Sequence, residues 1–161
     1  MDIVNSYIPQ GQAPDSEKFA YKLDWFARLC RYFERYYSPE NALVWVGDFN
    51  VAPDPIDVYD PVKLQGSVGF HPEEHRALVR IKAWGFEDTY RRFHPLEKAY
   101  TFWDYRIPNA FKRGLGWRID HIWATRSMTK RAVAAWIDSE PRSFERPSDH
   151  TFITAEFENS L

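Results

Sequence analysis

Five groups of polar side chains follow or interrupt apolar stretches of the sequence. They are Asn5–Tyr7 with Gln10, Asp48 with Asn50, Asp104 with Arg106, Asp120, and Asp149 with His150. Apolar stretches of this kind predict strands, and α/β folds place their sites at strand ends, because the backbone there opens into a crevice. We therefore expect Asp48, Asn50, Asp120 and His150 to converge in one pocket.

The residue types in these groups suit the chemistry of a phosphate ester beside a divalent cation. Carboxylates bind a hard cation such as Mg²⁺, which prefers oxygen ligands. An amide donor can stabilise a phosphoryl oxygen, and a histidine can carry a proton or assist that charge. Each member also has a plainer explanation, since Asp48 and Asp149 could simply cap turns, and a lone histidine such as His71 is most often a solvent-facing or capping residue. The combination of groups, and no single residue, indicates a site.

The first third of the chain predicts a strand and a long helix that would help to position these groups. Ile3–Ile8 has the composition of a strand, and Asp15 or Ser16 is placed to cap the helix that follows. The apolar stripe of this helix comprises Phe19, Leu23, Phe26, Leu29 or Cys30, and Phe33. The helix must end near Pro39, because proline cannot continue it.

The remaining two thirds predict further strands with shorter helices between them. Ala42–Val46 is apolar throughout, as in a strand covered on both faces. Residues 51–70 contain three prolines and predict an irregular loop, Pro72 and Gly85 mark the ends of a second helix, and a helical turn is expected around Asp88–Phe93. Further strands are expected at 101–103, 117–124, 132–138 and 151–157. Helices among strands predict an α/β layered fold.

Length and composition bound the class of protein. A chain of 161 residues, 44% hydrophobic and 27% charged, is long enough for one domain with a genuine core. Its one cysteine, Cys30, excludes an internal disulfide and a cysteine-based zinc site. There is no apolar run of about 20 residues and no basic-plus-apolar leader, which predicts a soluble protein of the prokaryotic cytoplasm with no membrane contact. The aromatic share of 17% is high, so some rings are expected to face a ligand or a partner surface.

Six segments match, in order, the motifs of a known family. They are Asn5–Gly11, Gly47–Asn50, Trp84–Arg91, Trp103–Arg106, Arg118–Asp120 and Pro147–His150. On these segments the chain resembles the C-terminal half of the exonuclease III family (apurinic/apyrimidinic endonuclease type) of the endonuclease/exonuclease/phosphatase superfamily. The resemblance implies that residues 1–161 form half of a four-layer α/β sandwich of the DNase I-like type, with one mixed β-sheet and covering helices. It also implies a DNA-repair nuclease that hydrolyses phosphodiester bonds with Mg²⁺ or Mn²⁺.

The resemblance further implies catalytic roles for five residues. Tyr7 would approach the scissile phosphate, and Asn50 would hold a phosphoryl oxygen. Asp48 would orient or deprotonate the attacking water, or protonate the leaving oxygen. Asp120 would hydrogen-bond to His150 and fix its tautomer, so that His150 stabilises the pentavalent phosphate or transfers a proton.

Metal and DNA contacts are implied in the same way. The implied metal residues are Asp48, Asn50, Asp149 and His150. The implied DNA contacts are Gln10, Phe102, Trp103 and Arg106, with Phe102 at the position of an aromatic wedge that lines the abasic-sugar pocket. The implied substrate is double-stranded DNA with an abasic site or a 3′ end.

The match also has gaps that leave other functions open. The family's metal-binding glutamate and an early asparagine belong to an N-terminal half that this sequence lacks, so we expect the isolated chain to be weakly active or inactive. Two alternatives are a non-catalytic fragment that binds DNA or a partner chain, and a phosphatase or phosphodiesterase relative of the same superfamily. A bared sheet face lined by Ile3–Ile8 and Ala42–Val46 would favour pairing with a second copy or with the missing half.

Overall fold

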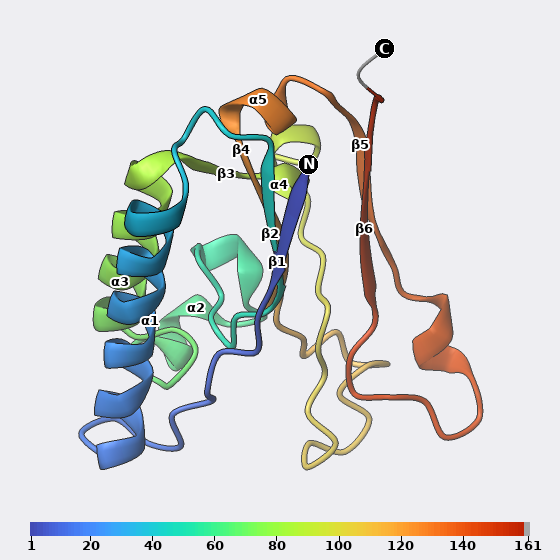
Figure 1. The fold of residues 1–161 in the computed structure, drawn as a ribbon. Coiled ribbons are helices and arrows are strands. Elements are labelled where there is room, and N and C mark those ends of the chain that lie inside the picture. The colour runs from blue at the N-terminus through green and yellow to red at the C-terminus, as the bar shows by residue number, and fades with distance from the viewer. Residues whose placement is uncertain (160–161) are drawn as a thin grey trace.

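The computed structural model describes residues 1–159, which form three layers (Figure 1). Two long helices cover one face of a four-stranded sheet, and a two-stranded ribbon lies on the other side of that sheet. The strands are β1 Asp2–Asn5, β2 Leu43–Asp48, β3 Phe86–Asp88, β4 Asp120–Thr125, β5 Ala132–Asp138 and β6 Phe152–Phe157. The α-helices are α1 Glu17–Tyr36, α2 Pro61–Leu64, α3 Pro72–Gly85, α4 Thr89–Phe93 and α5 Arg126–Thr129, with 3₁₀ turns at Pro55–Asp57 and Glu140–Ser143. None of these helices has the length and apolar content needed to cross a membrane.

The two long helices begin and end where the sequence predicts. The Ser16 side chain accepts a hydrogen bond from the Phe19 amide and so caps α1. His71 caps α3 before Pro72, whose missing N–H costs nothing in the first turn. Gly85 ends α3 with φ +149°, where an added Cβ would lie 2.6 Å from the Cβ of Pro39. The expected helical turn around Asp88–Phe93 is also present, as α4.

The four-stranded sheet has the order β1-β2-β4-β3 and is mixed, as predicted. β1 runs parallel to β2, whereas β4 pairs antiparallel with both β2 and β3. In the β2–β4 register Trp45 lies opposite Trp123, and Asp48 lies opposite Asp120. Because successive side chains on a strand point to opposite faces, this one register sends the two indoles to the same side of the sheet and brings the two carboxylates together at its end.

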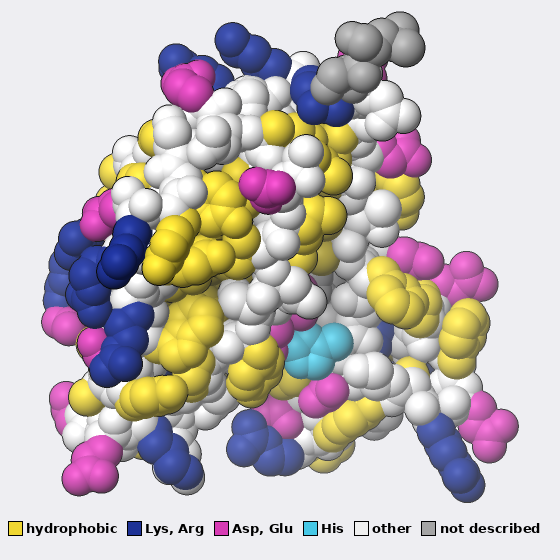
Figure 2. All heavy atoms as spheres, in the orientation of Figure 1, with side chains coloured by type: hydrophobic (Ala, Val, Ile, Leu, Met, Phe, Trp, Pro, Cys, Tyr) yellow, Lys and Arg dark blue, Asp and Glu magenta, His cyan; other side chains and the backbone are white. Residues whose placement is uncertain are grey.

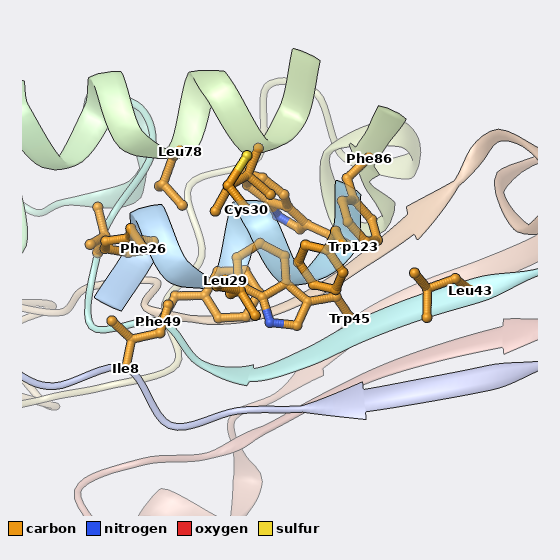
Figure 3. Close-up of a cluster of buried hydrophobic side chains, with 13 residues drawn as sticks. Ile8, Phe26, Leu29, Cys30, Leu43, Trp45, Phe49, Leu78, Phe86 and Trp123 are labelled. Carbon is orange, nitrogen blue, oxygen red and sulfur yellow. The ribbon is translucent and has the colours of Figure 1, made fainter. Parts of the chain in front are cut away.

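Aromatic rings fill the core between the sheet and the helices (Figure 3). Trp45 stacks on Phe49 with a centroid distance of 3.8 Å, and Trp123 meets Trp45 edge-on at 5.5 Å. Phe26 of α1 and Leu78 of α3 close the cluster from the helical layer. Many of the rings in this chain are therefore core residues, as is Cys30, which lies in the same cluster.

Three sequence predictions about strands need correction. A second, two-stranded sheet joins the predicted one, because β5 and β6 pair only with each other. Thr101–Trp103 forms no strand, since Phe102 makes only isolated bridges to Trp117 and His150. Ala42–Val46 does not line a bared face: Leu43 and Trp45 face the helices, while Val44 packs in a cluster that includes Phe157 of the ribbon.

A buried network of charges lies beneath β4. Arg118 is fully buried and donates to Asp57 from Nε at 2.7 Å and to Asp88 from Nη2 at 2.8 Å. Asp57 also pairs with Arg91. Burial and then the charge of Arg118 lower the pKa of His121 to about 4, so this histidine is neutral and its Nδ1 accepts from the Arg118 guanidinium. Arg118 and His121, which flank Asp120 in the sequence, are both fixed by this network.

We predict that Arg118→Met strongly destabilises the fold. The substitution leaves the Asp88 carboxylate without its cation in a buried site, and such a break typically costs about 3–5 kcal/mol. Urea denaturation of the purified variant measures the free energy of unfolding. The exposed Arg113→Met is the control, and we expect it to change stability by less than about 0.5 kcal/mol. Equal stability of the two variants would contradict the prediction.

Candidate active site

A polar pocket of about 530 Å³ opens at the end of the four-stranded sheet where β2 and β4 meet the loops. Its lining includes Tyr7, Gln10, Asp48, Asn50, Phe102, Asp104, Arg106, Trp117 and His150. Figure 2 shows a histidine with acidic side chains next to it in the lower part of this face of the molecule. Most of the residues predicted for a site are thus brought together here.

Two carboxylates and a histidine form the centre of the pocket. One ligand-type atom each of Asp48, Asp120 and His150 lies within 4.8 Å of the others. The Asp120 carboxylate accepts a hydrogen bond of 2.8 Å from Nδ1 of His150, as the sequence predicted. With Nδ1 engaged in this way, Nε2 is the ring nitrogen that remains for other contacts.

Asn50 holds Asp48 in place. Its backbone amide donates to one oxygen of Asp48 at 2.8 Å, and its side-chain Nδ2 donates to the other oxygen at 3.0 Å. The same Nδ2 donates to the Ile8 carbonyl at 2.9 Å. Asn50 adopts this geometry with φ +50°, a left-handed conformation that asparagine tolerates better than most residues. The predicted convergence of Asp48, Asn50, Asp120 and His150 is confirmed.

Burial and mutual repulsion set the protonation of these groups. Burial, followed by the charge of Asp120, raises the pKa of Asp48 to about 6, even though the amide of Asn50 opposes this. Burial lowers the pKa of His150, but the hydrogen bond and the charge of Asp120 outweigh it and hold that pKa above its ordinary value. Near neutral pH the pocket therefore combines a carboxylate that readily accepts a proton with a histidine that readily keeps one.

Aromatic and amide side chains form the walls. Phe102 lies against His150 with ring centroids 4.9 Å apart, and Trp117 lines the same pocket. Tyr7 is 65% exposed at the mouth, and Gln10 lies beside it in the lining. These rings give the pocket one flat, apolar side next to its charged centre.

One predicted site residue lies elsewhere, one lies beside the central group, and one is partly neutralised. Trp103 is only 5% exposed and packs with Tyr100 inside the 100–115 loop, so the predicted contact of Trp103 with DNA is wrong. Asp149 is not part of the three-residue carboxylate and histidine group, although its charge helps to raise the pKa of His150. Arg106 reaches the pocket but pairs with Asp104 through an Nη2–Oδ2 contact of 2.7 Å.

The sequence analysis missed Lys22. It is a fully buried lysine of α1 whose Nζ donates to the backbone carbonyls of Gln10 and Asn50. The spacing of the apolar residues could have predicted its burial, because Lys22 lies three residues after Phe19 and four before Phe26, on the buried side of the helix. A charge at such a position requires a buried partner.

The carboxylates fit a divalent cation. Asp48 and Asp120 repel each other, as the raised pKa of Asp48 indicates, and a cation between them would relieve that repulsion. Mg²⁺ is commonly bound by one or two carboxylates and completed by water and phosphate oxygens. The described residues therefore offer a partial ligand set of this kind.

Comparison with known proteins places the chain in a family. Residues 3–150 match the model of the "Endonuclease/Exonuclease/phosphatase family". The exodeoxyribonuclease III of Haemophilus influenzae is 33% identical over 98% of this chain, which spans 61% of that protein. The chain thus covers about three fifths of the length of such relatives.

Solved structures agree with this likeness. An AP endonuclease from Archaeoglobus fulgidus is 45% identical and superposes with a TM-score of 0.93 over 98% of this chain and 62% of its own. The 3′ phosphatase NExo from Neisseria, in a variant bound to a product DNA hairpin, is 38% identical with a TM-score of 0.90 over 97% of this chain and 60% of its own. The resemblance inferred from six short motifs therefore extends to the whole fold of the described residues.

We predict that Asp48→Asn stabilises the chain in a pH-dependent way in EDTA. The pKa of Asp48 rises from 3.8 to about 6 on folding, so its ionisation opposes folding. This penalty is absent below about pH 4 and fully present above about pH 6, so the variant should gain on the order of 1–3 kcal/mol over the parent at neutral pH and nothing in acid. Urea denaturation across this range measures the difference, with the exposed Asp2→Asn as the control. A difference that does not change with pH would contradict the prediction.

Proposed function

Because the chain belongs to the endonuclease/exonuclease/phosphatase family, we propose that it is the C-terminal portion, residues 1–161, of a DNA-repair nuclease. In this proposal it hydrolyses a DNA phosphodiester bond with a divalent cation, Mg²⁺ or Mn²⁺. The observation that carries the proposal is the hydrogen-bonded Asp120–His150 pair beside the Asp48–Asn50 pair in one polar pocket. The likeness to exodeoxyribonuclease III and to an AP endonuclease supports it.

The proposed reaction breaks one P–O bond by attack of water on phosphorus. Asp48, with its pKa near 6, accepts or orients the proton of the water. Asn50 would hold a phosphoryl oxygen by exchanging the bond that its side-chain amide makes to Asp48 or to the Ile8 carbonyl for one to the phosphate. His150, protonated and oriented by Asp120, places its Nε2–H against the charge that develops on the phosphate. The departing oxygen takes a proton from Nε2 of His150, the proton taken from the water returns the site to its starting state, and the products are an alcohol end and a phosphate monoester end.

A cation would be held by Asp48 and Asp120, with Asn50, His150 and Asp149 close to it. When bound, it would neutralise charge on the phosphate and polarise its P–O bonds. Mg²⁺ is the preferred ion of this proposal, because the candidate ligands are mainly oxygens.

The walls of the pocket suggest the kind of DNA that it accepts. Phe102 and Trp117 present flat apolar surfaces next to His150, which suit a sugar without its base. Tyr7, Gln10 and Arg106 line the same pocket, where Tyr7 would approach the scissile phosphate and Gln10 and Arg106 would contact the DNA strand. The names of the two structural relatives, an AP endonuclease and a 3′ phosphatase, favour an abasic site or a 3′ end as the substrate.

A second candidate is a chain that binds DNA or a partner but hydrolyses little. Among residues 1–159 the group of ligand-type side chains at the site has only two carboxylates and one histidine. A cation with so few protein ligands is positioned loosely, and loose positioning costs much of the rate. Binding of an abasic-site duplex without cleavage would identify this candidate.

We predict slow incision of an abasic-site duplex in Mg²⁺ that stops on addition of EDTA. Asp48→Ala and His150→Ala should each lower the rate by about 10²-fold or more, because each removes a group that moves or holds a proton. Gel analysis of a labelled duplex measures the rate. Asp24→Ala, an exposed acidic position on α1, is the control and should cleave as the parent does. Cleavage that survives Asp48→Ala would sink the proposed mechanism.

Apolar side chains at two places favour a protein partner as well. Ile3 at the outer edge of the sheet is 61% exposed, and β1 pairs only with β2. Trp136 and Phe152 lie on the face of the ribbon turned away from the sheet, since strand alternation puts them opposite Phe157. We propose that a second copy, or a complementing chain that supplies a further strand and layer, covers these surfaces.

Light scattering tests the pairing of two copies. We expect the pure chain to have about twice its mass of 19.1 kDa at micromolar concentration, and Trp136→Lys with Phe152→Lys to shift it toward the monomer. Val62→Lys, at an exposed position on α2, is the control. A monomeric parent that binds no hydrophobic dye would rule out an uncovered apolar surface.

A further inference from the structure

We propose that the buried ion pair between Lys22 and Glu74 positions the reactive centre, by holding the loops that carry Gln10, Asn50 and Gly69 in one fixed arrangement. The reactive centre is the group formed by Asp48, Asn50, Asp120 and His150. Neither Lys22 nor Glu74 lines the pocket, but all three loops do. This proposal rests on the proposed function for its catalytic readout. Its structural readout is independent of that function.

The ammonium group of Lys22 makes three contacts from the inside of the molecule. It meets Glu74 Oε1 at 2.5 Å, and it donates to the carbonyls of Asn50 at 2.8 Å and of Gln10 at 3.1 Å. Two of the three N–H donors of the ammonium are used on backbone carbonyls, and the carboxylate of Glu74 balances its charge. The lysine therefore joins the loop after β1 to the loop after β2.

Glu74 extends the connection to a third loop. Its Oε2 accepts from the Gly69 amide at 2.8 Å and from the His71 amide at 3.0 Å. The Gly69 carbonyl in turn accepts from the Ala52 amide at 2.8 Å, two residues after Asn50. The ion pair thus connects the loop before α3, at Gly69, to the loop after β2, at Asn50.

The hydrogen bond from Lys22 to the Asn50 carbonyl stabilises the left-handed backbone conformation of Asn50. Asn50 has φ +50°, which is unfavourable for a residue with a side chain, and this conformation aims its amide at both oxygens of Asp48. The charged donor of Lys22 binds the Asn50 carbonyl on the other side of the same residue. Without that bond the peptide after Asn50 loses its charged partner, and we expect Asn50 to hold Asp48 less firmly.

Gly11 packs closely against the side chain of Lys22. Gly11 has φ +93°, and a Cβ added there would lie 3.1 Å from Cδ of Lys22 and 3.4 Å from Val68. Lys22 and Glu74 are both 0% exposed at their side chains. A pair of charges at such a site is not needed for stability, because apolar replacement of a buried pair is often neutral. Its value is then in the arrangement that it imposes.

The test replaces the pair together, as Lys22→Met with Glu74→Gln. The double variant leaves no uncompensated buried charge, and the glutamine introduced in place of Glu74 keeps an acceptor for the Gly69 and His71 amides. We expect its thermal midpoint to stay near that of the parent, its kcat on an abasic-site duplex to fall by about 10- to 100-fold, and its KM to change by less than about two-fold. Lys18→Met, an exposed position on the same helix, is the control. A folded double variant with the parent kcat would overturn the proposal.

Hydrogen exchange gives a second readout that needs no catalysis. Amide exchange of Asn50 and Ala52 should quicken by about ten-fold or more in the double variant, while that of Trp123 in β4 stays unchanged. If the parent chain cleaves no DNA, the proposed function fails but this measurement still decides the positioning role. Unchanged exchange at Asn50 and Ala52 would overturn the proposal, as would equal quickening throughout a destabilised molecule.

Discussion

The pairing of β2 with β4 brings the carboxylates of Asp48 and Asp120 together, and the surrounding side chains reduce the repulsion between them. The register places Asp48 directly opposite Asp120 at the last step of the ladder. Like charges opposite each other destabilise a sheet, and burial makes the repulsion stronger. Two neighbours reduce the cost, because Asn50 donates twice to Asp48 and His150 donates to Asp120. As a result Asp48 can accept a proton near neutral pH, while His150 tends to keep one, so the site can both take and give a proton.

Two buried cations, Lys22 and Arg118, hold the chain close to these carboxylates, and each has acidic partners of its own. Lys22 lies under the loop of Asn50 and reduces the pKa rise of Asp48, while burial lowers the pKa of Lys22 and Glu74 counteracts that. Arg118, two residues before Asp120, is fixed by Asp57 and Asp88 in the same way. Each reactive strand end is thus anchored by a buried pair whose charges are balanced locally. Rigid anchoring of this kind limits the relaxation that would otherwise let the two carboxylates separate.

The sequence predicted the helices and the central strands because their signals are local. The cap at Ser16, the proline at 72 and the apolar run before Asp48 each act within a few residues. Thr101–Trp103 was predicted wrongly because its alternation resembles a strand, whereas Phe102 bridges two segments that the sequence does not connect. The partner of Lys22 could not be predicted, since Glu74 lies 52 positions further along the chain and reaches it only through the packing of α3 on α1. The four residues of the reactive centre were identified through motif order, which carries long-range information that periodicity lacks.

The pocket is acidic, so a divalent cation would be needed for DNA to bind there as well as for the proposed hydrolysis. Asp48 and Asp120 lie at the centre of the pocket, Asp149 adds its charge beside His150, and the nearby Arg106 is paired with Asp104. A DNA strand carries a negative charge on each phosphate, so it would be repelled at the distance where hydrolysis occurs. His150 in its protonated form offsets only part of this field. A divalent cation between the carboxylates would offset most of the remaining negative charge, so the same ion would favour both the approach of DNA and the proposed step of hydrolysis.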